Sequence, residues 1–119
     1  MILVVDDDVT MRRKLQHILT DAGQDVVLAD DGIEALSALN EHEFDMVFLD
    51  VMMPGLNGLE CLRILGRSFP RLKVCMLTSL QEQDLLADLA GYGAADCLAK
   101  PINTQSVLRK VHKLCPLPA

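Results

Sequence analysis

Five short apolar runs alternate along the chain with longer amphipathic segments, and this alternation leaves few possible folds. The runs are Met1–Val5, Val26–Ala29, Met46–Leu49, Val74–Leu77 and Cys97–Ala99. Within each run the apolar residues are continuous, which is typical of parallel strands covered on both faces. We therefore predict five strands of one parallel sheet.

The segments between the runs predict helices, because their apolar residues recur every three or four positions. In the first segment Met11, Leu15, Ile18, Leu19 and Ala22 show this spacing, and Gly23 predicts the helix end. Two further helices, with the apolar residues expected to point inward, are Ile33–Glu41 (Ile33, Leu36, Leu39) and Leu59–Arg67 (Leu59, Leu62, Leu65). The fourth helix is predicted near Glu82–Ala90, with Leu85, Leu86 and Leu89 as its apolar residues. The fifth is predicted near Thr104–Leu114, with Val107, Leu108, Val111 and Leu114 as its apolar residues. Pro101 and Asn103 mark the start of the fifth helix.

Strands that alternate five times with helices predict an α/β three-layer sandwich with right-handed crossovers. Residues 1–114 are expected to form one domain. Cys115–Ala119 contains two prolines and is expected to be a tail or the start of a linker. In such a sheet the ligand site lies at the carboxyl ends of the strands.

Charge and cysteine spacing argue against several classes of protein. The net charge of −6 argues against direct nucleic-acid binding, which needs a basic face. Four widely spaced cysteines, without a CxxC pair, indicate neither a zinc site nor a disulfide framework. The first apolar run meets Asp6 too early for a signal peptide or membrane span. We expect a soluble cytoplasmic protein that does not bind a membrane.

Polar residues capable of chemistry follow four of the five strands, at the edge where the strands end. They are Asp6, Asp7 and Asp8 after the first run, Asp50 after the third, Thr78 and Ser79 after the fourth, and Lys100 after the fifth. Crowded carboxylates repel one another, and a hard cation such as magnesium relieves that repulsion. A magnesium site favours reactions in which the reacting group carries negative charge through the transition state, above all phosphoryl transfer.

Within this group the residue types suggest separate roles. Asp50 is the candidate nucleophile, because it follows four apolar strand residues and a carboxylate can attack a phosphoryl group. Lys100 would place a positive charge on the phosphoryl oxygens and Thr78 a hydroxyl donor. Asp8 is expected to cap the first helix rather than bind metal.

The chain resembles the receiver domain of two-component response regulators over essentially its whole length. The resemblance lies in Val5-Asp6-Asp7, in Asp50 with Met53-Pro54-Gly55, in Leu77-Thr78-Ser79 and in Lys100-Pro101. The stretch Thr10-Met11-Arg12-Arg13 is also similar to chemotaxis-type single-domain regulators. The family implies a flavodoxin-like (βα)5 fold with a parallel sheet of strand order 2-1-3-4-5.

The resemblance also implies the site and the partners. Asp50 would be the phosphoacceptor, and Asp7 would hold Mg²⁺ together with Asp50 and the backbone carbonyl of Met52, with Asp6 helping through water. Thr78 would move toward the phosphoryl group and Lys100 would pair with it. The protein would be a signalling switch rather than an enzyme, with intrinsic Mg²⁺-dependent autophosphorylation and autodephosphorylation.

The implied phosphodonor is a sensor histidine kinase or a histidine phosphotransfer protein, and the implied target is a downstream effector domain or protein. A homodimer through the fourth helix, fifth strand and fifth helix is also expected. This sequence departs from the family at Cys97, where an aromatic residue of the switch is usual. By family analogy Met52 and Leu80 would flank the attacking water and tune phosphoryl lifetime.

Two alternatives accompany this interpretation. Asp6-x-Asp8-x-Thr10 also resembles the nucleophile motif of haloacid-dehalogenase-like phosphatases, with Asp6 as nucleophile. That family needs acidic metal ligands after its lysine, and residues 101–119 contain no Asp or Glu. The other alternative is a receiver-like binding module that is never phosphorylated.

Overall fold

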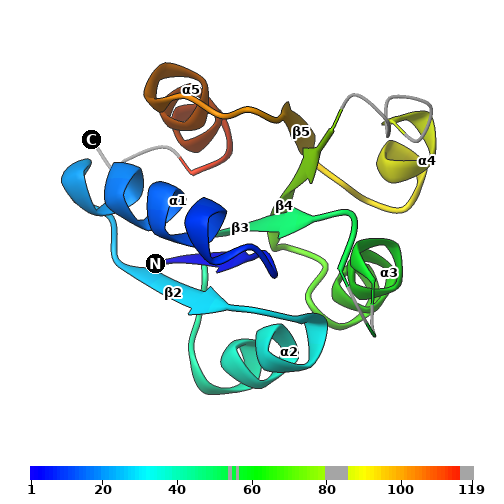
Figure 1. Ribbon diagram of the computed structural model, residues 1–119. Coiled ribbons are helices and arrows are strands. Elements are labelled where there is room, and N and C mark those ends of the chain that lie inside the picture. Colours follow the sequence, from blue (N-terminus) through cyan, green and yellow to red (C-terminus); the bar gives the residue numbers. More distant parts are fainter. Residues whose placement is uncertain (54, 56, 80–85, 116–119) are drawn as a thin grey trace.

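The computed structural model of the protein describes residues 1–53, 55, 57–79 and 86–115. Five strands form a single parallel sheet of order β2-β1-β3-β4-β5, which confirms the flavodoxin-like fold and its strand order. The elements are β1 (Ile2–Val5), α1 (Val9–Asp21), β2 (Val26–Ala29), α2 (Gly32–Glu41), β3 (Met46–Asp50), α3 (Gly58–Ser68), β4 (Lys73–Thr78), α4 (Leu86–Gly91), β5 (Asp96–Ala99) and α5 (Thr104–Leu114) (Figure 1).

Helices cover both faces of this sheet, because successive residues of a strand point to opposite sides. In β1, Ile2 and Val4 face α1 and α5, whereas Leu3 and Val5 face the layer that contains α2, α3 and Leu89 of α4. Figure 1 shows α1 with α5 on one side of the sheet and α2 with α3 on the other. The continuous apolar runs therefore arise from burial on both faces.

The helix limits follow capping residues. Asp8, Asp31, Asn57 and Asn103 each accept a backbone N–H of the helix that they precede. After α1 the chain turns at Gly23, whose φ of 85° is a conformation that glycine adopts readily. The prediction of Thr104–Leu114 as a helix is confirmed without change at either end.

The inward face predicted for α2 was wrong in its first residue. Ile33 is 66% exposed, and the buried residues are Gly32, Ala35 and Leu39. Asp31 caps the helix, so Gly32 is its first residue, and positions three and seven further on share its face. Ile33 lies one position, about 100° around the helix, from that face.

The fourth helix is described from Leu86 to Gly91, and Leu89 is its fully buried residue. The predicted beginning, residues 82–85, and the inward position of Leu85 lie outside the described residues, as do the four residues after Cys115. None of the described helices is long and apolar enough to cross a membrane.

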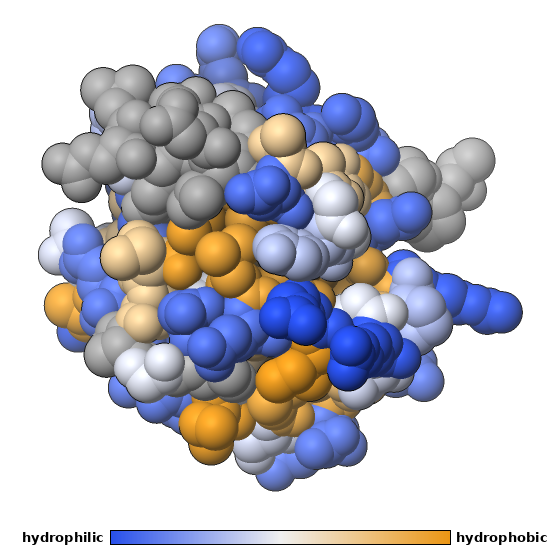
Figure 2. Space-filling model, turned by 90° about the vertical axis from the view of Figure 1, so that its right-hand side faces the viewer, coloured by the Kyte–Doolittle hydropathy of each residue, from blue (hydrophilic) through white to orange (hydrophobic). Residues whose placement is uncertain are grey.

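The strands β1, β2 and β3 all point toward the right-hand side of Figure 1, so their carboxyl ends meet at that edge. Figure 2 presents this side of the molecule, where apolar atoms lie among strongly hydrophilic ones. The N-terminus lies toward the opposite side (Figure 1), where its ammonium group contacts Asp45 at 2.7 Å. The edge that the sequence predicted as a ligand site is thus separate from the N-terminus.

Candidate functional site

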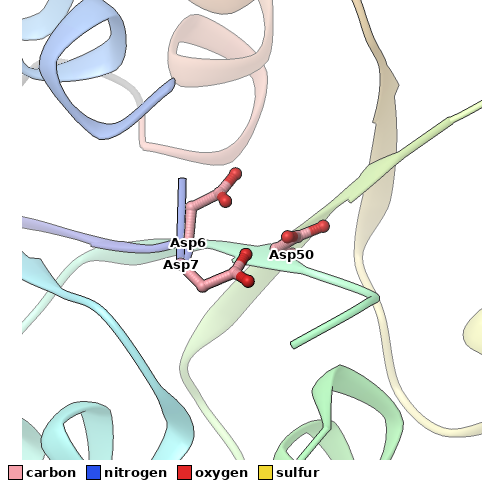
Figure 3. Close-up of side chains that lie close together, drawn as sticks. All are labelled: Asp6, Asp7 and Asp50. Carbon is pink, nitrogen blue, oxygen red and sulfur yellow. The ribbon is translucent and has the colours of Figure 1, made fainter. Parts of the chain in front are cut away.

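The parallel register of β1 and β3 brings two carboxylates side by side. Val5 pairs with Leu49, and Asp6 and Asp50 are the next residues along the two strands. They therefore lie at the same height at the edge of the sheet. Carboxylate oxygens of Asp6, Asp7 and Asp50 all lie within 4.8 Å of one another. Figure 3 shows these three side chains gathered beyond the strand ends. Residues 43 positions or more apart in sequence are therefore joined in one acidic cluster.

The loop between β1 and α1 sends its three aspartates in different directions. Asp6 is fully buried, and its Oδ1 accepts the backbone N–H of Asp8 at 2.9 Å. Asp8 is the N-cap of α1, and its Oδ1 accepts the backbone N–H of Thr10 at 2.9 Å. The expectation that Asp8 caps the helix is confirmed. Asp6 and Asp7 remain for the acidic cluster.

Lys100 reaches this cluster from the end of β5. Its Nζ lies 3.2 Å from Oδ1 of Asp50 and 3.3 Å from Oδ2 of Asp6. Its backbone N–H donates to the carbonyl of Thr78 at 2.7 Å, which joins the ends of β4 and β5. Thr78 itself is buried at the last position of β4. The carboxylates, the hydroxyl and the ammonium group predicted for the site therefore all come from strand ends at one edge of the sheet.

Burial and mutual repulsion make the charged state of Asp50 costly. The pKa of Asp50 is raised to about 7, because burial and the neighbouring carboxylate of Asp6 raise it more than Lys100 lowers it. Burial alone would lower the pKa of Lys100, but Asp50 and Asp6 together raise it. One ammonium group therefore does not neutralise the carboxylates that surround it.

The donor set suits a hard divalent cation. The cluster offers carboxylate oxygens alone, which are ligands that magnesium prefers. Oδ2 of Asp6 is buried and has no hydrogen-bond partner among the described residues, although it lies at ion-pair distance, 3.3 Å, from Nζ of Lys100. Beside this ion pair the buried oxygen still has room for a hydrogen-bond donor or a metal ion as a further partner. Asp7 is exposed, so the cluster opens to solvent on that side.

Gly58 was missed by the sequence reasoning, and it fixes the backbone of Asp50. A Cβ at position 58 would lie 2.1 Å from the carbonyl oxygen of Asp50 and 2.7 Å from Cα of Val51. The backbone N–H of Gly58 donates to the carbonyl of Val51 at 3.0 Å. Helix α3 can therefore start against the end of β3 because residue 58 has no side chain. The pair Asn57-Gly58 was the available signal, since Asn is a common N-cap.

The residues expected to affect the switch and the phosphoryl lifetime have different surroundings. The side chain of Met52 is 64% exposed, two residues after Asp50. Cys97 is half-buried and packs against the core cluster on the α2–α3 side of the sheet. Leu80 lies outside the described residues, so its expected position beside an attacking water stays a prediction.

The fold and the site together define a class: a flavodoxin-like α/β protein with a buried acidic cluster and a lysine at the carboxyl edge of its sheet. Residues 2–112 match the family described as the response regulator receiver domain. The chain belongs to this family, a component of two-component signalling. The resemblance seen in the sequence is confirmed, and the haloacid-dehalogenase-like alternative is set aside.

Relatives of two kinds resemble the chain. It is 34% identical over 113 residues to the chemotaxis protein CheY of Listeria monocytogenes, covering 94% of this chain and 95% of CheY. It is 41% identical over 111 residues to a transcriptional regulatory protein, the CpxR homolog of Haemophilus influenzae, covering 92% of this chain and 48% of that protein. The chain thus spans about half the length of the CpxR homolog.

Among solved structures, the receiver domain of NtrX from Brucella abortus superposes with a TM-score of 0.94 at 30% identity, covering 99% of this chain and 100% of that one. The chemotaxis protein CheY4 of Vibrio cholerae gives a TM-score of 0.89 at 30% identity, covering 95% of this chain and 96% of CheY4. Accepting a phosphoryl group is the function of this family.

Proposed function

We propose that Asp50 is the phosphoacceptor and that its donor is a phosphohistidine of a sensor kinase or of a histidine phosphotransfer protein. A carboxylate oxygen of Asp50 forms the new bond to phosphorus, the nitrogen–phosphorus bond breaks, and the released imidazole regains a proton. The observation that carries this proposal is the place of Asp50, a buried carboxylate between an acidic pair and the ammonium group of Lys100.

The acidic cluster would hold Mg²⁺ through Asp7 and Asp50, with Asp6 acting directly or through water and the backbone carbonyl of Met52 completing the protein ligands. When bound, the ion neutralises the negative charge that gathers on the phosphoryl oxygens. The support from this chain is the all-oxygen donor set and the buried Oδ2 of Asp6, to which no described residue donates a hydrogen bond.

Lys100 and Thr78 would act on the product of the transfer. Lys100 contacts Oδ1 of Asp50 and would pair with the phosphoryl oxygens once Asp50 carries the acyl phosphate. The hydroxyl of Thr78 stands at the end of the neighbouring strand and would donate to the same group. A new charge near −2 at this point biases the surrounding loops toward one of two arrangements.

The phosphorylated domain would act as a switch that changes which downstream effector domain or protein it binds, inside the cytoplasm. With Cys97 in place of an aromatic residue, this output would depend on α4 and the loop before it. Pairing of two copies through α4, β5 and α5 is part of the same proposal. So is a domain boundary near Leu114, with the last five residues as a tail or linker.

A small phosphodonor tests the central assignment. Purified protein is incubated with acetyl phosphate and Mg²⁺, and its mass is measured. We expect a gain of one phosphoryl group in the wild type and none in Asp50→Asn. Asp8→Asn is the matched control, because Asp8 is a helix cap outside the cluster, and it should still gain the group. A wild-type protein that gains no mass would instead favour a receiver-like module that is never phosphorylated.

A further inference from the structure

Arg12, in the second turn of α1, reaches back to the loop that carries the acidic pair. Its Nη1 donates to the backbone carbonyl of Asp6 at 2.7 Å, in a partly buried position. This carbonyl stands at the end of β1, beyond the last residue paired with β3. A hydrogen bond from a charged donor is typically stronger than one between neutral groups. The contact therefore fixes the direction in which Asp6 leaves the strand.

Lys14, half a turn further along α1, makes the corresponding contact to a second loop. Its Nζ donates to the backbone carbonyl of Ile102 at 2.8 Å, across 88 positions of sequence. Ile102 is buried and stands two residues after Lys100, between β5 and α5. Helix α1 is thus bonded both to the loop of the acidic pair and to the loop of the lysine.

We infer that Arg12 and Lys14 are positioning residues of the phosphoacceptor site, and that they set the separation between the acidic pair and Lys100. The inference rests on the proposed function, since it assigns these contacts to magnesium binding and phosphorylation. The separation matters because Nζ of Lys100 forms ion pairs with a carboxylate oxygen of Asp6 at 3.3 Å and of Asp50 at 3.2 Å. A shift of either loop would change how many carboxylate oxygens can reach one cation.

Arg13 provides a matched control. It lies between the two positioning residues, carries the same charge as Arg12 and is exposed, and its side chain makes no hydrogen bond or ion pair within the described part of the chain. Arg12→Gln and Arg13→Gln each remove one positive charge. By electrostatics alone both changes would strengthen Mg²⁺ binding, because a cation near the site repels the metal. If Arg12 is a positioning residue, Arg12→Gln should instead weaken Mg²⁺ binding.

The first experiment is a calorimetric titration with Mg²⁺. We expect Arg12→Gln to weaken binding about tenfold, the usual effect of losing a residue that orients metal ligands. Arg13→Gln should leave the affinity within about twofold of wild type. Arg12→Lys, which keeps the charge but lacks the planar donor group, should recover only part of the loss. Unchanged or tighter binding in Arg12→Gln would overturn the inference.

The second experiment needs no metal. Amide hydrogen exchange is followed by NMR in protein freed of divalent cations. In Arg12→Gln the amide of Asp8, which donates to Asp6, should exchange about tenfold faster, whereas Arg13→Gln should match wild type. In Lys14→Gln the amide of Lys100, which donates to Thr78, should exchange faster and that of Asp8 should not.

The two experiments separate the inference from the proposed function. A wild-type protein that binds no Mg²⁺ would end the proposed function, while the exchange rates would still decide whether Arg12 and Lys14 fix the two loops. Equal exchange at Asp8 in wild type and Arg12→Gln would end the inference even if the wild type binds Mg²⁺ and gains a phosphoryl group.

Discussion

At the scale of single residues, the repulsion between the carboxylates of the acidic cluster depends on pH, because it depends on whether Asp50 is ionised. The pKa of Asp50 is raised from 3.8 to about 7, so the folded protein binds this proton more tightly than the unfolded chain does. The tighter binding of this proton therefore adds to the free energy of unfolding at low pH, and this addition is lost as the pH rises from about 4 to about 7. Replacing Asp50 by an uncharged residue should remove this loss of stability at higher pH.

We predict that Asp50→Asn stabilises the magnesium-free protein above neutral pH. The gain should be roughly 2 kcal/mol near pH 8 and much smaller near pH 5, where Asp50 is already largely protonated. Thermal unfolding in EDTA at both pH values measures it. Asp8→Asn serves as control and should show no such dependence. A difference between wild type and Asp50→Asn that is equal at both pH values would contradict the raised pKa.

Gly58 gives a second prediction at this scale. Gly58→Ala should lower the free energy of unfolding by about 2 kcal/mol or more, because the new Cβ meets backbone atoms that cannot move aside. Gly66→Ala in the same helix is the control. Its Cβ would lie 3.6 Å from the backbone carbonyl oxygen of Tyr92, an ordinary contact distance, so helix propensity alone should stabilise the protein by about 0.5–1 kcal/mol. Urea unfolding of both variants checks the opposite signs.

These two residues show what the sequence could predict at a site and what it could not. Asp50 was found because a charged residue that ends a continuous apolar run must lie at a sheet edge. Gly58 was not recognised, since its importance depends on how closely α3 approaches β3. Local sequence gives no measure of that distance. For the same reason the sequence did not predict the contact of Arg12 with the backbone carbonyl of Asp6.

At the scale of elements, the predicted strands lie within one residue of those observed, because burial on both faces leaves an unbroken apolar run. Helix faces were harder to predict. Ile33 is apolar and has helical spacing with Leu36, yet it is exposed, and Ala35 is buried in the face instead. A small residue at a close helix–sheet contact gives a weaker apolar signal than the larger one beside it.

An ion-pair cluster joins the start of β5 to α5 and allows a prediction at this scale. Oδ2 of Asp96 lies 3.0 Å from Nζ of Lys110 and 2.8 Å from Nζ of Lys113. Burial would raise the pKa of Asp96, but hydrogen bonds from Lys113, the backbone N–H of Cys97 and Lys110 outweigh it and lower the pKa to about 2. This contribution to stability is present above pH 4 or so and is lost as the pH falls toward 2.

Asp96→Asn should therefore lower the free energy of unfolding at neutral pH by about 1 kcal/mol, a value that allows for screening by solvent. High salt should reduce the difference. Asp21→Asn is the control, since within the described part of the chain Asp21 pairs with the exposed side chain of His17 alone, and this pair should contribute almost nothing. Urea unfolding at low and high salt measures both. Equal effects of the two substitutions would show that the cluster around Asp96 adds no stability.

At the scale of the whole molecule, one observation about the sheet was enough to place the site. Strands that run parallel must all end at the same edge, so the polar residues that follow them gather there. Composition and spacing alone could not give the strand order, which came with the family resemblance. Since this order sets β1 beside β3, it also decides that Asp6 and Asp7 meet Asp50.

Magnesium binding by this cluster should raise the stability of the entire domain, because the unfolded chain lacks the site. Above the dissociation constant, each tenfold increase in free Mg²⁺ should add about 1.4 kcal/mol, or roughly 5–10 °C in Tm for a domain of this size. Asp7→Asn should lose most of this increase. Asp30→Asn is the control, because Asp30, Asp31 and Glu34 form a second group of acidic side chains near α2. Thermal unfolding over a Mg²⁺ series, with NaCl at matched ionic strength, distinguishes them. An increase that survives in Asp7→Asn and disappears in Asp30→Asn would place the cation at the wrong cluster.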